Sequence, residues 1–119
     1  MKVINIKEKF NQFSEHWTPK KIGELNGQQI LLAKLKGEFI WHAHDNEDEL
    51  FMIIKGLLII EFRDKTIELN EGEMYIIPKG VAHKPIAKEE VHVLLFEPLE
   101  IKHTGNILSD VTVTTFENI

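Results

Sequence analysis

The chain of 119 residues contains no cysteine, and this absence excludes several classes of protein at once. A disulfide scaffold, a thiolate metal site and a cysteine nucleophile all require the missing side chain. The absence is also typical of a reducing compartment, so we expect a cytoplasmic protein. No apolar run approaches the roughly 18 residues of a membrane span, and the first ten residues lack the apolar stretch of a signal peptide.

Positive charge is scarce as well. Lysine and arginine together number 14 against 19 acidic residues, the formal net charge is -5, and Arg63 is the single arginine. The longest basic run is Lys20-Lys21, which is too short to attract a phosphate backbone. We therefore expect neither a nucleic-acid partner nor binding to a membrane surface. Hydrophobic residues at 43% and charged residues at 28% are typical of a globular protein.

Short apolar segments separated by turn residues dominate the chain from residue 17 onward. Asn26-Gly27 between two such segments is a strong hairpin signal. Many short strands at near-regular spacing predict an all-β sandwich or barrel. The expected strands cover residues 30–35, 39–44, 50–54, 57–62, 66–69, 74–77 and 91–96.

The chain is short enough for one domain, 1–119, with three parts. Residues 1–16 form an N-terminal arm in which Ile6, Phe10 and Phe13 have the spacing of a short amphipathic helix. Residues 17–97 form the barrel, and residues 98–119 form a C-terminal extension. Its strand-like residues 112–116 could join the edge of their own sheet or that of a partner. Several strands are apolar on successive residues, so both faces need cover, and we expect a homodimer.

Four of the polar side chains have the types and spacing of metal ligands. His42 and His44 stand two residues apart, which in a strand places both imidazoles on one face. Glu49 opens the next strand, and His83 follows the turn at residues 78–80. Three neutral imidazoles and one carboxylate suit a divalent first-row metal ion. Histidines on strands are often packing or surface residues, so the spacing alone leaves that alternative open.

The glycines around these residues give a more specific signal. Gly37, four residues, His42-x-His44, four residues, Glu49, six residues and Gly56 resemble the first motif of the cupin superfamily. Gly72, five residues, Pro78-x-Gly80, two residues and His83 resemble the second motif. The resemblance implies a double-stranded β-helix, or jelly-roll, barrel. It also implies one divalent ion, Mn, Fe, Ni or Zn, held by His42, His44, Glu49 and His83.

The chain departs from the cupin pattern at two positions. Four residues separate Gly37 from His42 where five is usual, and Ala87 replaces an asparagine that usually follows the second-motif histidine. The stretches 41–51, 72–74 and 104–106 resemble a group of small cupins that are often labelled mannose-6-phosphate isomerase-like. That label rests on the fold, which does not determine the reaction.

Three further residues are expected to line the pocket. Phe51 and Ile53 share parity with Glu49 on their strand, and His92 would join them if its face points inward. The motifs contain no arginine, which argues against a sugar phosphate. We expect a metal-dependent enzyme, a dioxygenase or an isomerase, acting on a small polar or aromatic or keto molecule. The alternative is a cupin that binds a small ligand, or senses it, without catalysis.

Overall fold

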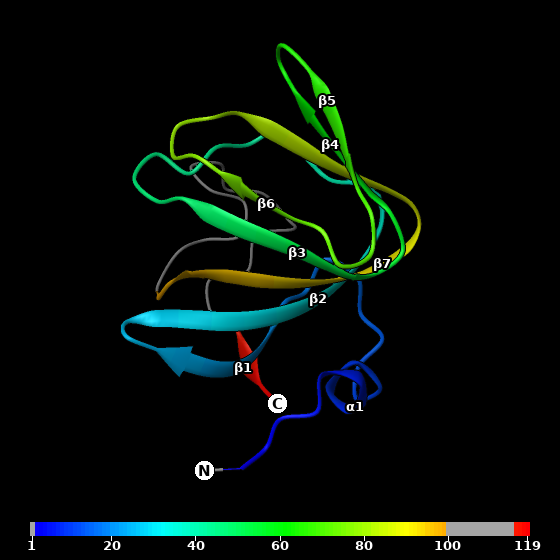
Figure 1. The fold of residues 1–119 in the computed structure, drawn as a ribbon, viewed down its shortest axis with the longest axis vertical. Helices are drawn as coiled ribbons and strands as arrows, with labels where there is room; N and C mark the ends of the chain where they lie inside the picture. The colour runs from blue at the N-terminus through cyan, green and yellow to red at the C-terminus, as the bar shows by residue number, and fades with distance from the viewer. Residues whose placement is uncertain (1, 100–115) are drawn as a thin grey trace.

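The computed structural model describes residues 2–99 and 116–119. Its described residues are mostly strands, with one small helix at the N-terminal end (Figure 1). This confirms the predicted all-β jelly-roll class with a short N-terminal helix. The elements are α1 (Ile6–Phe10), β1 (Lys20–Leu25), β2 (Gln28–Glu38), β3 (Glu49–Lys55), β4 (Leu58–Phe62), β5 (Thr66–Leu69), β6 (Met74–Ile77), β7 (His83–Pro98) and β8 (Glu117–Asn118).

The long strand β7 joins the two walls of the barrel. It pairs with β2 along most of its length, with β4 in its first part and with β3 in its second part. The hydrogen-bonded order is β5-β4-β7-β2-β1-β8, and β3 pairs with both β6 and β7. Strand β7 therefore begins at His83 of the second motif and ends beside β3, which begins at Glu49 of the first motif.

Alternation along β3 and β7 separates an inner face from an outer face. On β3, Phe51 and Ile53 point into the core with Glu49, whereas Leu50 and Met52 are partly exposed. Fourteen buried side chains fill the barrel, and they come from β2 through β7. The core is mainly aliphatic, so polar side chains on the inner face stand out against it.

Gly56 makes the turn between β3 and β4 and cannot be replaced without strain. Its φ of +92° lies in the left-handed region that favours glycine. A Cβ at this position would lie 3.0 Å from the Glu90 carbonyl oxygen and 3.3 Å from Val91 Cγ2. A side chain at this turn would therefore require β7 to shift by a few tenths of an ångström.

The helix α1 is shorter than the segment from Ile6 to Phe13, whose apolar residues have the spacing of an amphipathic helix. Asn5 caps it by accepting a hydrogen bond from the Glu8 backbone N–H at 3.0 Å, and it ends at Phe10. Phe10 and Phe13 pack against Leu32 outside the barrel. No helix among the described residues has the length and apolarity needed to cross a membrane.

One expected strand is absent from the structure, and another lies mostly outside the described residues. Residues 39–44 form no strand, because only one bridge, between His42 and His83, pairs this segment with the rest of the barrel. Residues 112–115 lie outside the described residues. The described end of the tail, β8, pairs in parallel with β1 of the same chain, with Lys20 opposite Glu117. The end of the tail thus adds to the edge of its own sheet.

Candidate metal centre

Backbone hydrogen bonds bring the two sequence motifs together at their histidines. The His42 N–H donates to the His83 carbonyl oxygen at 3.1 Å, and the His83 N–H donates to the His42 carbonyl oxygen at 2.9 Å. His44 follows two residues after His42, and the His42 and His44 ring centroids are 5.4 Å apart. The bridge between the motifs therefore gathers three imidazoles in one place.

Hydrogen bonds to carbonyl oxygens determine the tautomers of two of these rings. His42 Nδ1 lies 2.9 Å from the Ile40 oxygen, and His83 Nδ1 lies 3.0 Å from the Val81 oxygen. A carbonyl oxygen only accepts, so each Nδ1 carries the hydrogen and donates it. In the neutral rings the Nε2 atoms then hold lone pairs, which is the arrangement that a metal-binding histidine needs.

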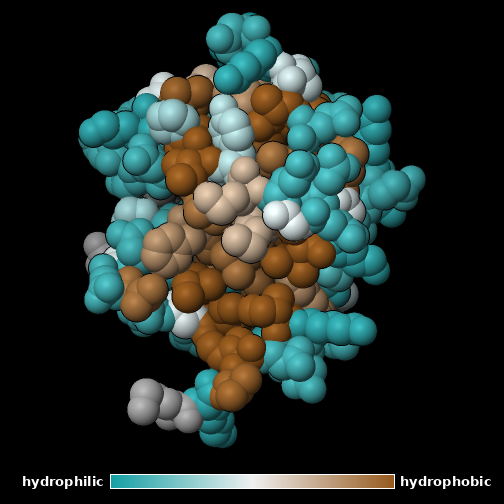
Figure 2. Space-filling view, in the orientation of Figure 1, coloured by the Kyte–Doolittle hydropathy of each residue, from teal (hydrophilic) through white to brown (hydrophobic). Residues whose placement is uncertain are grey.

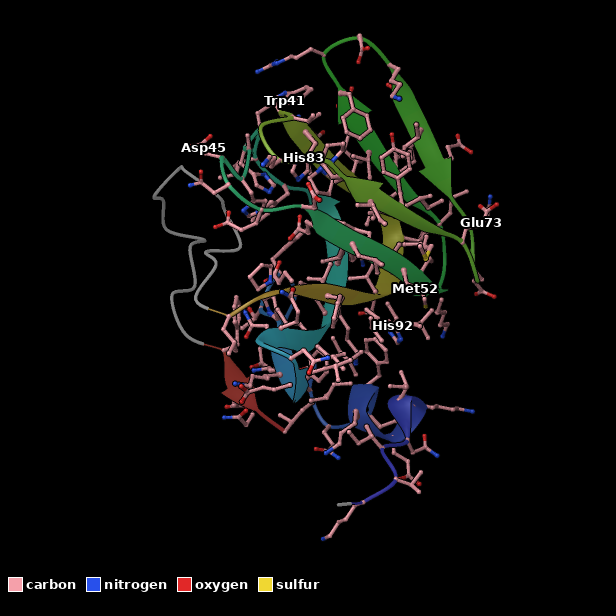
Figure 3. All side chains as sticks on the ribbon, turned by 60° about the vertical axis from the view of Figure 1, so that its left-hand side comes forward. Trp41, Asp45, Met52, Glu73, His83 and His92 are labelled. Carbon is pink, nitrogen blue, oxygen red and sulfur yellow. The ribbon has the colours of Figure 1, made fainter. Side chains whose placement is uncertain are left out.

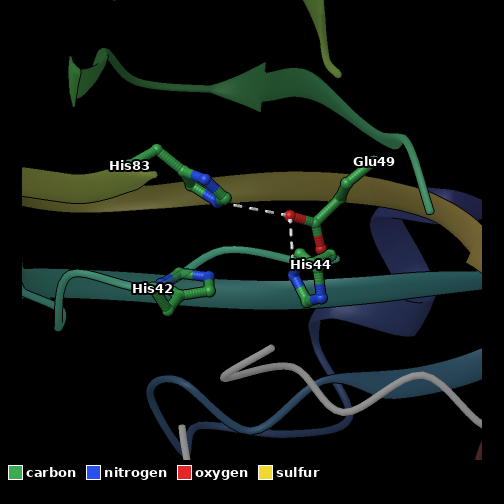
Figure 4. A group of neighbouring side chains, drawn as sticks. All are labelled: His42, His44, Glu49 and His83. Atoms are coloured by element: carbon green, nitrogen blue, oxygen red, sulfur yellow. Dashed lines mark ion pairs between the residues drawn. The ribbon is translucent and has the colours of Figure 1, made fainter. Parts of the chain in front are cut away.

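Glu49, the first residue of β3, points its carboxylate at the histidines (Figure 4). Its Oε1 lies 3.5 Å from His44 Nε2 and 3.6 Å from His83 Nε2. These distances are too long for good hydrogen bonds. Ligands bound to one ion at about 2.0–2.2 Å lie up to about 4.4 Å apart, so the spacing suits two ligands of a shared cation.

The four side chains are close enough together, and buried enough, to bind one metal ion. Their ligand atoms all lie within 4.8 Å of one another, and all four residues are buried. Among the described residues, both nitrogens of His44, the Nε2 of His83 and the Oε1 of Glu49 have no hydrogen-bond partner. Buried polar atoms are normally satisfied. A divalent cation would satisfy one nitrogen of His44, the Nε2 of His83 and the Oε1 of Glu49 at once, so the residues present fit the metal.

The electrostatics of the cluster favour the charge states that bind a cation. Burial, followed by the nearby His83, lowers the pKa of His42 to about 4, so this ring is neutral at pH 7. Burial alone raises the pKa of Glu49, but the imidazoles of His44 and His83 outweigh it and hold that pKa below its ordinary value. The site therefore offers an ionised carboxylate beside a neutral imidazole.

Comparison with known proteins agrees with this arrangement. The family profile for the cupin domain matches residues 31–97, which is more than half of the chain. The chain belongs to the cupin superfamily. A cupin-2 domain containing protein from Shewanella frigidimarina shares 52% identity with it at a TM-score of 0.80, over 81% of this chain and 94% of that one.

Two other relatives are similar over less of the sequence or at lower identity. Protein NMB1881 from Neisseria meningitidis shares 32% identity at a TM-score of 0.75, over 82% of this chain and 99% of that one. The uncharacterized protein YdbB of Bacillus subtilis strain 168 is 40% identical over 80 residues. That match covers 66% of this cupin and 65% of YdbB, slightly less than two thirds of the relative.

A small cavity in this cupin opens onto the cluster. Its volume is about 30 Å³, and His42 and Glu49 form part of its wall. The other lining residues are apolar or aromatic: Trp17, Pro19, Ala33, Leu35, Phe39, Phe51, Pro85, Val93 and Leu95. Trp17 stacks on Phe39 with ring centroids 4.7 Å apart, and Phe39 meets the His42 ring edge-on. A molecule in this cavity would contact metal ligands on one side and hydrocarbon on the others.

Of the three residues expected to line the pocket, one lies in the cavity wall and two do not. Phe51 lines the cavity. Ile53 is buried in the core and is not part of the cavity wall. The placement of His92 in the pocket is wrong, because its ring stacks on Phe10 at 4.4 Å and its Nε2 lies 3.0 Å from Glu90. Figure 3 shows His92 beside the helix, well away from His83. Residues 91, 93, 95 and 97 occupy the inner face of β7, which leaves residue 92 outside.

The sequence pattern does not single out Glu97, a buried charged residue of β7. Only 1% of Glu97 is exposed, and apart from Glu49 no described residue forms a hydrogen bond with its carboxyl group. Parity identifies it only once β7 is known to be continuous from His83, because residues 83 and 97 are separated by an even number and share the inner face.

Proposed function

We propose that this cupin binds one divalent first-row metal ion on His42, His44, Glu49 and His83 and acts on a small molecule as a dioxygenase or an isomerase. A cation bound there would polarise a carbonyl or enolate oxygen or bind dioxygen. The protein would contribute orientation, because the carbonyl groups of Ile40 and Val81 hold two imidazoles in place. The observation that carries the proposal is the apolar cavity that ends at two of the four ligands.

The size and lining of the cavity support a particular kind of ligand. A volume of about 30 Å³ holds about two water-sized molecules. That space suits a diatomic gas or one end of a keto compound whose remainder stays at the cavity mouth. The apolar wall excludes water from the bound end, which strengthens electrostatic contacts with the ligands.

The lining also bears on the mannose-6-phosphate isomerase-like label. Within residues 2–99 and 116–119, no lysine or arginine lines this cavity. Phosphate recognition usually employs such side chains. We therefore propose that the substrate carries no phosphate, and that the label reflects the fold.

One observation favours the alternative of a binding or sensing cupin without catalysis. In the described part of the chain, the only titratable side chains in the cavity wall are His42 and Glu49, and both belong to the metal cluster. A reaction that needs a separate general acid or base has no such group in the wall. A dioxygenase reaction depends less on a separate general acid or base than an isomerase reaction does.

Two measurements distinguish a metal-dependent enzyme from a cupin that binds its ligand without catalysis. We expect metal-loaded wild type, and not metal-free protein, to consume dioxygen with some member of a panel of small β-diketones and flavonols. Ala33→Val narrows the cavity and should abolish turnover while calorimetry shows unchanged metal binding. If diketones or flavonols bind without turnover, the protein is a binding or sensing cupin without catalysis. If wild type and His42→Ala bind those molecules equally, the metal has no part in the function.

We further propose that the chain forms a homodimer through the outer face of β3 and β6. Figure 2 shows a band of hydrophobic residues down the side of the molecule that faces the viewer, with hydrophilic residues on both sides of it. On this face Met74 is 49% exposed and Ile76 is 51% exposed. Glu73 precedes β6 and Lys79 follows it, both exposed. A twofold axis would place the Glu73 end of one copy beside the Lys79 end of the other, so the charges match a second copy.

A further inference from the structure

Glu97 has no role in the four-ligand cluster, yet its surroundings do not explain it as a packing residue. It is the last inward-pointing residue of β7 and has 1% of its surface exposed. Apart from the carboxyl group of Glu49, no described group forms a hydrogen bond with either of its oxygens. Buried carboxyl groups whose only partner is another acid are rare, because burial removes the solvation of the charge.

The register of the sheet places Glu97 beside the ligand Glu49. Leu50 pairs with Phe96 and Phe51 pairs with Leu95 in the antiparallel ladder of β3 and β7. One further step along that ladder brings Glu49 opposite Glu97, and both residues are buried on the inner face. Directly opposed side chains have Cβ atoms about 4.5–5.5 Å apart, and like charges at such positions repel.

Nothing else in the described barrel compensates these two carboxylates. The only ion pairs of Glu49 there are with His44 and His83, and Glu97 has none. Gln29 lies opposite Glu97 on the other side, on β2, but its amide nitrogen donates to the Pro98 carbonyl oxygen at 3.3 Å. Burial, and then the charge of Glu49, raise the pKa of Glu97 well above its ordinary value. The fold therefore retains a pair of acidic groups at a cost.

We propose that Glu97 is the second carboxylate of the metal centre, a positioning residue that balances the charge of the cation from behind Glu49. Two carboxylates and three neutral imidazoles match the charge of one divalent ion. Glu97 lies outside the group of ligand atoms that are within 4.8 Å of one another. It therefore acts through Glu49 and through the charge of the site and is not a fifth ligand. The inference rests on the proposed metal site.

The isosteric change Glu97→Gln tests this role in two directions at once. We expect metal-free Glu97→Gln to melt at a higher temperature than metal-free wild type at pH 7, because the cost of burying a second carboxyl group beside Glu49 is removed. We expect its affinity for Mn²⁺ and Zn²⁺, measured by calorimetry, to fall about 10- to 100-fold, which is typical of residues that support metal ligands. A residue needed only for packing would not produce opposite changes.

Three further variants make the result decisive. Glu68→Gln makes the same chemical change at an exposed position of β5 and should alter neither quantity. Glu97→Asp keeps the charge and should bind metal more tightly than Glu97→Gln. Equal metal affinity of Glu97→Gln and wild type overturns the inference, as does a metal-free Glu97→Gln that melts below wild type or fails to fold. If His83→Gln abolishes binding while Glu97→Gln does not, only the role of Glu97 fails. If wild type binds neither ion, the proposed function fails as well.

Discussion

The two faces of β3 and β7 differ, because the inner face holds two carboxyl groups within an otherwise apolar core, whereas the outer face of β3 carries partly exposed apolar side chains. Small barrels normally turn apolar side chains inward and polar ones outward. Here Glu49 and Glu97 lie inside, and Leu50 and Met52 on the next positions lie on the outer face. The polar groups inside are retained despite the cost of burying them, which indicates a site that needs their charge. The apolar groups outside have no such chemistry and instead indicate a surface that requires cover.

Removing a ligand from the inner face should have the largest effect. We expect His83→Gln to weaken metal binding by about 100-fold or more, because even supporting residues contribute 10- to 100-fold. Calorimetry with Zn²⁺ or Mn²⁺ measures the change. His92→Gln is the matched control, since it removes an imidazole from the outer face of the same strand. Equal losses in both variants would contradict the division between the faces.

Charging the outer face should have the next largest effect. We expect Met74→Glu to weaken self-association about 100-fold, because a carboxylate would be buried at the proposed interface near its own copy. Sedimentation velocity at micromolar concentration measures this change. Val3→Glu also charges an exposed apolar residue, 98% exposed and outside the strands, and should leave the association unchanged. A wild type that sediments as a monomer would refute the dimer.

Substitutions at the turn that joins β3 to β4 measure how strongly the close contact between this turn and β7 constrains the barrel. We expect Gly56→Ala to lower the free energy of unfolding by about 3 kcal/mol, because a positive φ and a close backbone contact both oppose a side chain. Gly27→Ala has the same kind of φ, +77°, with nothing within 4 Å of the added Cβ. It should cost about 1 kcal/mol. Urea unfolding measures both, and equal costs would remove the steric argument.

The smallest effect is expected at an exposed carboxylate of β7. The hydrogen bond from His16, followed by that from His92, lowers the pKa of Glu90 to about 2, and Lys34 adds a favourable charge. Because this pKa lies below the ordinary value of 4.5, the stabilisation is complete above pH 4.5. It disappears as the pH falls from about 4.5 to about 2. The side chain is 43% exposed, so we expect less than about 1 kcal/mol.

Urea unfolding of Glu90→Gln and wild type at pH 7 and pH 3 checks this expectation. The difference in their free energies of unfolding should be smaller at pH 3. Glu68→Gln, which changes an exposed glutamate without an ion pair in the described structure, should show no such trend. An unchanged difference for Glu90→Gln would show that its partners stabilise the fold without regard to its charge.

Much of the candidate site follows from local spacing. The pair His42 and His44, the glutamate that opens the next strand and the histidine after the proline turn could be read from the chain, since each depends on a few neighbouring residues. The strands 66–69 and 74–77 were predicted with the observed bounds, because turn residues delimit both.

The error at His92 and the omission of Glu97 share one cause. The expected strand began at residue 91, so its inward face could not be counted from His83. In the structure β7 continues without interruption from His83 to Pro98, through the exposed residues 88–90. Counting from His83 puts residue 92 outside and residue 97 inside. Three consecutive exposed polar residues carry no local sign of a strand, and the continuity of β7 through them depends on its partner strands.

By itself the chain determined which side chains can hold a cation and where it must turn, because these are properties of short segments. Only the tertiary structure decided that His83 meets His42 and that Glu97 stands behind Glu49. Those neighbours are brought together by pairing between strands that are far apart in sequence, and the strength of such pairing depends on the whole barrel.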